Sequence, residues 1–246
     1  MHSNMKAIYI STILLLVISI LTVNSCKKEK EEPEPQQPTA PKNPTTVKDI
    51  DGNVYSIVKI GEQFWTKENL KTTKFSDGSG ISNVTDNTAW SNWALLSSPA
   101  WCNYENSADS SAIYGKLYNW YTVADPRKVC PTGWHVPTDS EWTVLTDFLG
   151  GAPVAGVKMK TTYGWNDYNG LSGNGSNESG FSGLPGGLRN GYSGEFLVIG
   201  DGGGWWSSSE SSSTNSWNRS LDYNSGPTYR NGDYKQSGFS VRCLKD

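Results

Sequence analysis

The first 46 residues of this 246-residue chain are predicted to take no part in a folded core, which restricts where a domain can form. Residues 1–6 are short and cationic, and residues 7–23 are apolar without a charge. That run nearly suffices to span a bilayer, so either a cleaved export signal or a permanent membrane helix fits it. Residues 27–46 are charged and then rich in proline, a composition that buries too little to offset its ordering entropy. Folding is therefore expected within residues 47–246, enough for one domain.

The residues before Cys26 favour the cleaved signal. Val23-Asn24-Ser25-Cys26 resembles the lipobox of bacterial lipoproteins, in which a small residue precedes a cysteine that is acylated and becomes the new N-terminus. We therefore expect a signal peptide over 1–25 and a disordered tether over 26–46, attached to the membrane through acyl chains on Cys26. The cluster at 27–32 resembles the export signal of Bacteroidetes surface lipoproteins, with a solvated charge run as the alternative. The predicted location is the outer membrane, at the cell surface.

Local patterns predict the secondary structure of residues 47–246. Two alternating apolar runs at 47–61 surround Asp-Gly-Asn and predict a β-hairpin, which residues 63–65 are expected to extend. Residues 114–123 carry apolar and aromatic positions on one helical face and predict a helix. Thr138-Asp139-Ser140-Glu141 is a capping box followed by apolar residues at helical spacing, so a second helix is predicted up to Gly150-Gly151. Beyond it we expect short strands and long loops.

Charge and titratable residues argue against several classes of function. The net charge is -3 and the basic residues are scattered, so no basic stripe exists to bind nucleic acid. His135 is the only histidine after Cys26, and a structural role beside the helix start is favoured over proton transfer. Cys102 has no basic neighbour in sequence that would activate it as a nucleophile. The glycine-rich run 200–204 lacks the lysine and the strand-to-helix setting of a phosphate loop.

Acidic residues in the second half keep a hydrolase and a Ca²⁺ site open as alternatives. A glycoside hydrolase needs two carboxylates about 5 to 9 Å apart. The available carboxylates are Glu178, Glu195, Asp201, Glu210 and Asp222. Acidic loop residues are mostly solvated, so a non-catalytic protein is preferred. No Cys/His cluster has zinc spacing and no stretch matches the EF-hand pattern, so no cofactor is expected and Ca²⁺ stays possible without assigned ligands.

Tryptophan provides the most suggestive positive signal. The chain contains 11 tryptophans, whose flat faces can stack on sugar rings. Trp205 and Trp206 follow three glycines, and adjacent strand residues face opposite sides, so at most one of them fills the same core. A ligand-binding surface is therefore predicted here. It comprises Trp205, Trp206, Asn218, Arg219, Tyr229 and Arg230.

Eight blocks of residues, in order along 47–246, resemble the Fibrobacter succinogenes major paralogous domain. The blocks are 49–55, 58–61, 68–70, 114–121, 130–138, 180–187, 205–208 and 238–243. That family occurs in signal-bearing, often lipid-anchored proteins, and its biochemical role is poorly defined. More remotely, residues 137–142 and the Gly-Phe-x-x-Arg ending resemble formylglycine-generating enzymes and other C-type-lectin-like folds. This implies an α+β, C-type-lectin-like domain with two helices, small twisted antiparallel sheets and long loops.

The same resemblance implies a disulfide between Cys130 and Cys243, because such folds commonly join a late strand to an early element. Spacing alone does not choose among the three cysteines of the domain. The bridge would contribute about 4 to 5 kcal/mol by the chain-entropy estimate. Cys102 would then be free, buried or in an intermolecular bond. Formylglycine-generating enzymes rely on active-site cysteines that have no counterpart here, so their activity is not implied.

Three functional hypotheses follow. The leading one is a non-catalytic binding or adhesion lipoprotein whose ligand is a glycan or a surface protein, which predicts an exposed aromatic platform beside amide and arginine groups. A structural envelope component without a small ligand predicts a broad apolar patch instead. An enzyme acting on extracellular polysaccharide predicts a cleft with converging carboxylates.

Overall fold

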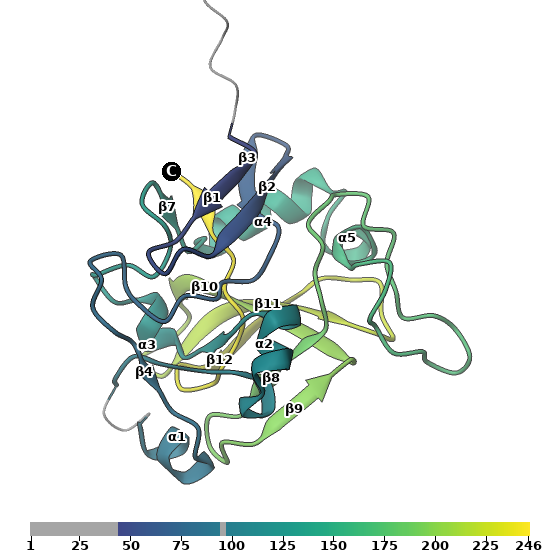
Figure 1. Ribbon diagram of the computed structural model, residues 1–246. Helices are drawn as coiled ribbons and strands as arrows, with labels where there is room; N and C mark the ends of the chain where they lie inside the picture. Colours follow the sequence, from purple (N-terminus) through teal and green to yellow (C-terminus); the bar gives the residue numbers. More distant parts are fainter. Residues whose placement is uncertain (1–43, 94–96) are drawn as a thin grey trace, which may run out of the picture. The chain divides into compact units, whose positions relative to one another are not determined.

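The computed structural model describes residues 44–93 and 97–246, except for the side chain of Trp93 (Figure 1). The predicted signal peptide, the lipidation site Cys26 and all but the last residues of the predicted tether lie outside this part, so they remain predictions. Within the described residues, no helix has the length and apolar character needed to cross a membrane.

The first sheet brings the two ends of the domain together. Its strand order is β1-β2-β3-β13-β7, and every pair is antiparallel. The strands are β1 (Thr46–Lys48), β2 (Val54–Ile60), β3 (Gln63–Thr66), β7 (Trp134–His135) and β13 (Leu244–Lys245). The predicted hairpin and its continuation are confirmed as β1, β2 and β3. In β13, Leu244 pairs with both Trp65 and His135, so the end of the chain closes this sheet.

The second sheet is built from the glycine-rich half of the chain, in the order β12-β11-β10-β8-β9 (Figure 1). Its strands are β8 (Gly186–Arg189), β9 (Phe196–Ile199), β10 (Gly202–Glu210), β11 (Asn215–Asp222) and β12 (Tyr229–Tyr234). β10, β11 and β12 form an antiparallel meander, whereas β8 pairs with β10 in parallel. A smaller third sheet contains β4 (Ser82–Asn83), β5 (Ala100–Cys102) and β6 (Leu117–Tyr118).

The described helices are more numerous and shorter than expected. They are α1 (Asn87–Trp93), α2 (Ala108–Tyr114), α3 (Trp120–Val123), α4 (Asp139–Phe148), α5 (Ala152–Met159) and the 3-10 helix η2 (Tyr104–Asn106). The predicted helix with the capping box is confirmed as α4, with Thr138 and Glu141 bonding reciprocally. The expectation of only two helices was wrong, because helices of four to eight residues carry too few apolar positions to show a period.

The predicted helix at 114–123 was also wrong, because this segment is divided between three elements. α2 ends at Tyr114, β6 follows, and α3 begins after its own cap at Asn119. Gly115 has a positive φ of 77°, and the backbone carbonyls of Asn69 and Leu70 press against it. Only glycine accommodates both constraints, so the chain turns out of the helix there.

The adjacent tryptophans of β10 fill two different parts of the core. Trp205 meets Phe181 edge to face at 5.6 Å, and Trp206 meets Phe239 in the same way at 4.7 Å. Trp206 shares its cluster with the disulfide between Cys130 and Cys243, which confirms the implied pairing. Trp205 belongs to a separate cluster under α4 and α5. The expectation that the two side chains do not share a core is confirmed.

A buried arginine connects segments that are distant in sequence. Arg242 is fully buried and donates to Asn69 Oδ1 (2.6 Å) and to the carbonyls of Thr66, Phe181 and Ser182 (2.8 to 3.0 Å). Burial lowers the pKa of Arg242 to about 9. Asn69 also accepts from Trp205 Nε1 at 2.8 Å. Four of the sequence blocks that resemble the family therefore meet in one structural network.

Candidate functional site

Strand alternation places the six residues of the predicted ligand surface on two opposite faces of the second sheet. Trp206 pairs with Asn218, and Ser220 with Tyr229, so Trp206, Asn218 and Tyr229 share one face. Trp205 pairs with Arg219, and Arg219 with Arg230, so these three share the other face. The six residues therefore do not form one surface.

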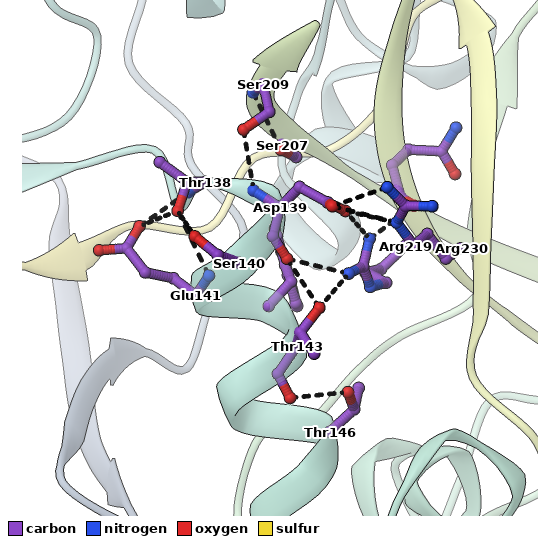
Figure 2. A network of polar contacts seen from close by, with 12 residues as sticks. Thr138, Asp139, Ser140, Glu141, Thr143, Thr146, Ser207, Ser209, Arg219 and Arg230 are labelled. Atoms are coloured by element: carbon purple, nitrogen blue, oxygen red, sulfur yellow. Dashed lines mark hydrogen bonds and ion pairs between the residues drawn. The ribbon is translucent and has the colours of Figure 1, made fainter. Parts of the chain in front are cut away.

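Arg219 and Arg230 converge on Asp139, the first residue of α4 (Figure 2). Arg219 Nη1 lies 2.7 Å from Asp139 Oδ1, and its Nη2 donates to the Asp139 carbonyl at 3.0 Å. Arg230 donates to both carboxylate oxygens at 2.9 to 3.0 Å. Burial by itself would raise the pKa of Asp139, but the hydrogen bonds from the two guanidinium groups outweigh it and lower the pKa.

This cluster joins α4 to the sheet and leaves few hydrogen-bond donors free for a ligand. The Arg219 side chain is only 3% exposed, and the Arg230 guanidinium lies 3.4 Å from the centre of the Trp217 ring. Ser209 Oγ accepts from the Asp139 amide, as Figure 2 shows, so the helix start is satisfied by the protein itself. The prediction that Arg219 contacts a ligand is corrected, because this buried side chain donates to Asp139 and Thr143. Arg230 also binds Asp139, but its side chain is 46% exposed, so its contact with a ligand stays a prediction.

The prediction of an exposed tryptophan platform is also corrected. Trp205 and Trp206 are both fully buried, because each face of β10 is covered at this point. Their indole nitrogens are satisfied inside the protein, by Asn69 Oδ1 and by the Tyr118 carbonyl, both at 2.8 Å. Neither ring presents a face on which a sugar could stack.

The face that carries Asn218 forms a groove with a volume of about 230 Å³. Strands β8, β9, β10, β11 and β12 line it, together with Phe239. Its lining residues are Gly187, Leu188, Val198, Gly202, Gly203, Gly204, Asn218, Ser220, Asp222, Asn231, Asp233 and Phe239. Tyr229 lies on the same face but not in the lining; it is 37% exposed, and its hydroxyl lies 2.7 Å from Ser225 Oγ.

Asn218 has a donor that the protein leaves unused. The residue is 1% exposed, and its Nδ2 finds no hydrogen-bond partner within the described part of the chain. Ser216 Oγ, two residues earlier on the same strand face, is also buried and unpartnered, but Ser216 does not line the groove. A buried polar group without a partner costs about 1 to 3 kcal/mol, so each such atom in a native protein needs an explanation.

Two carboxylates and an amide extend the polar side of the groove. Burial raises the pKa of Asp222, although Lys160 opposes the shift. Burial also raises the pKa of Asp233, although hydrogen bonds from Ser237 and the Tyr234 amide oppose it. Asn231 Nδ2 donates to Ser220 Oγ at 3.0 Å, which orients both side chains. Among the lining residues of the groove there is no lysine, arginine or histidine.

The apolar side of the groove contains a strained residue. Val198 lines the groove with a φ of 57°, in the left-handed region that a β-branched residue rarely adopts. Such backbone conformations cost about 1 to 3 kcal/mol and cluster at functional sites. Leu188 and Phe239 complete this apolar wall.

Sequence reasoning missed Ser220 and Asp233, whereas Asn231 was noted as a polar residue near the predicted surface. Their signal was the strand period of two: polar side chains recur at 218, 220 and 222 and again at 231 and 233. Of the five carboxylates considered for hydrolysis, only Asp222 lines the groove. Glu210 pairs with Lys235, Glu178 lies 3.7 Å from Lys158, and Asp201 accepts from Asn166.

The remaining candidates from the sequence occupy other places. His135 contacts Asp246 through Nδ1 at 2.6 Å and Glu141 through Nε2 at 3.1 Å, beside the start of α4. Cys102 is a free thiol in the core, and burial raises its pKa to about 11. Across residues 44–93 and 97–246, no group of three or more His, Cys, Asp or Glu side chains is placed to hold a metal ion.

These observations define the class: a mixed α/β domain, mostly of β-sheet with few and short helices, that is closed by one disulfide and carries a polar groove. The model of the Fibrobacter succinogenes major domain family matches residues 58–245, and the chain belongs to this family. Comparisons with curated proteins and with solved structures found no match.

Proposed function

We propose that this protein is a non-catalytic, lipid-anchored surface protein whose groove binds a neutral, hydroxyl-rich ligand, a sugar residue of a glycan. The observation that carries the proposal is Asn218, a lining residue of the groove whose buried Nδ2 has no hydrogen-bond partner within the described part of the chain. A ligand hydroxyl could accept this hydrogen bond, which would explain why a donor is kept buried there without a protein partner.

The rest of the lining supports the same class of ligand. Asp222 and Asp233 can accept hydrogen bonds from sugar hydroxyls, while Phe239, Leu188 and Val198 offer the apolar surface that the C–H face of a sugar ring requires. No cationic residue lines the groove within the described part of the chain, and this disfavours an anionic ligand. Its volume is below the roughly 300 to 1,000 Å³ of pockets for drug-sized ligands, which suits one sugar ring.

The location and the finer fold assignment are part of the proposal. Cys26 would hold the protein in the outer membrane by its acyl chains, and residues 26–46 would present the domain at the cell surface. A C-type-lectin-like relationship is consistent with the short helices and curved sheets, but the proposed ligand site lies on the β8–β12 sheet rather than in a calcium loop.

The test is a glycan array probed with the mature chain carrying Cys26→Ser, with and without Ca²⁺. An Asn218→Leu variant is expected to lose glycan binding by about tenfold or more. It should not lose stability, because leucine removes a buried donor that has no partner in the protein. Urea unfolding of the variant and the parent protein would measure the difference in their free energies of unfolding.

A matched control is Ser216→Ala, which removes the other unpartnered buried atom but lies outside the groove. It should leave glycan binding unchanged. Equal binding by Asn218→Leu and the parent protein would reject this groove as the site. Release of reducing sugar that depends on Asp222 and Asp233 would instead favour the enzyme hypothesis.

A second candidate function, a structural or protein-binding component of the envelope, is favoured by one observation. Helices α4 and α5 expose several apolar side chains: Val144 (55%), Phe148 (63%), Val154 (46%) and Val157 (42%). If no glycan binds, sedimentation of the parent protein beside a Phe148→Ser variant would test this alternative. Self-association or partner binding that is lost in the variant would support it.

A further inference from the structure

A second pocket, separate from the groove lining, lies between α5, the segment 168–174 and the turn 223–226. Its volume is about 240 Å³. Tyr168 and Tyr223 form one wall, with their rings edge to face at 5.6 Å. Val157 and Leu171 contribute apolar surface, and Leu171 is 73% exposed. The pocket therefore offers aromatic and aliphatic contact area that the protein leaves open.

Lys160 is the only charged residue that lines this pocket in the described chain. The residue is 97% buried, since only 3% of its surface is exposed. Its Nζ donates to the carbonyls of Asp222 and Ser225, both at 3.0 Å. An ammonium has three N–H donors, so these two bonds leave one donor available.

The positive charge of Lys160 is also not paired within the described residues, because no carboxylate lies within ion-pair distance of Nζ. Burial lowers the pKa of the ammonium, and the more distant charge of Asp222 opposes this shift. The centre of the Trp165 ring lies 5.2 Å from Nζ. A buried cation is normally paired, so an anionic partner fits here.

We propose that this pocket binds a carboxylate carried on a ring, with the carboxylate at Lys160 and the ring against Tyr168 and Tyr223. Such a group could come from an acidic sugar or from an aromatic acid, since both carry a carboxylate on a ring. The inference goes beyond the glycan groove, whose lining has two carboxylates and no cation.

The experiment follows the backbone amides of Tyr223, Asn224 and Gly226 by NMR in the mature Cys26→Ser chain. Benzoate, benzamide and benzylammonium have nearly the same shape but different charge. Benzoate is expected to bind saturably and about tenfold or more tighter than benzamide, and benzylammonium should cause no shift. Glucuronate, compared with glucose, forms the second arm and identifies which source of the carboxylate the pocket accepts.

Lys160→Met would leave two buried carbonyls without a donor and could unfold the protein, so the variant test uses Ser172. This residue lines the pocket and is exposed. Ser172→Asp should weaken carboxylate binding about fivefold relative to Ser172→Asn, which has a similar shape without the charge. Equal binding of benzoate and benzamide, equal binding by the two variants, or no saturable shift with either carboxylate would overturn the proposal.

Discussion

Glycine at positions 203 and 204 of β10 lets two neighbours approach the strand more closely than any side chain would permit. A Cβ at 203 would lie 2.5 Å from the backbone carbonyl oxygen of Leu184. A Cβ at 204 would lie 2.5 Å from the Phe239 ring. A Cβ at 202, by contrast, would come no closer than 3.2 Å to any neighbour, the side chain of Val198. Close packing therefore explains the glycines at 203 and 204.

Gly203→Ala is expected to lower the free energy of unfolding by about 1 to 3 kcal/mol, because a backbone oxygen cannot move aside as a side chain can. Gly202→Ala, one residue earlier, should change it by less than about 1 kcal/mol, since the contact is milder and alanine restricts the unfolded chain. Urea unfolding of both variants measures the difference. Equal stability of the two would contradict the packing explanation.

At the scale of elements, α4 is held at its first turn by both a local and a distant interaction. The capping box of Thr138 and Glu141 is local, and it satisfies backbone groups at the helix start. Asp139 is bound by Arg219 and Arg230, which come from the adjacent strands β11 and β12 (Figure 2). One carboxylate thereby orients the helix against the sheet, on the face opposite to the groove.

Asp139→Asn is expected to lower the free energy of unfolding by about 3 kcal/mol at pH 7, because it leaves the buried Arg219 without its counter-ion. The pKa of Asp139 in the folded protein lies below its ordinary value of 3.8. Its stabilising contribution is therefore present above pH 3.8 and is lost as the pH falls through the lower folded pKa. The stability difference between parent and variant should shrink in that acidic range.

Urea unfolding at pH 7 and at several values below pH 4 checks this prediction. Glu62→Gln is the control, since Glu62 pairs with Lys59 at the surface and such pairs contribute little. A difference for Asp139→Asn that stays constant with pH would show that the charge of Asp139 is not what stabilises α4.

At the scale of the whole molecule, the end of the chain is attached to its beginning by covalent and non-covalent links. Cys243 is joined to Cys130, 113 positions earlier. Arg242 donates to Thr66 and Asn69 from the first third of the domain. Leu244 of β13 pairs with β3 and β7. These three adjacent residues therefore hold the end of the chain against segments that are distant in sequence.

Replacing Cys130 and Cys243 together by alanine should lower the free energy of unfolding by about 4 to 5 kcal/mol, because the bridge closes a long loop. Urea unfolding of the variant and the parent protein measures this difference.

Thiol titration tests which cysteines are paired. The denatured, unreduced Cys26→Ser chain should show one thiol, that of Cys102, and the reduced chain three. In the folded protein Cys102 should not react at pH 8, since burial raises its pKa to about 11. Two or more thiols before reduction would contradict the pairing.

The sequence by itself determined those features whose causes lie within a few residues of one another. The hairpin at the start of the domain and the capped helix α4 depend on turn and capping chemistry over short spans, and both were predicted correctly. Strand alternation also correctly predicted that Trp205 and Trp206 do not pack in the same part of the core. The disulfide followed only from the family resemblance, because spacing does not select between cysteines.

Only the tertiary structure decided which side chains are buried and which polar atoms stay unpaired. From the sequence, Trp205 and Trp206 were predicted to form part of a ligand-binding surface. In the structure both are buried, because segments far away in sequence cover both faces of β10. Arg219 was predicted to contact a ligand. In the structure it binds Asp139 of α4, a residue 80 positions earlier in the sequence. Asn218 becomes a candidate site residue because packing of the sheet leaves its Nδ2 without a partner. Contacts of this length depend on how whole elements pack, which no local pattern of residues encodes.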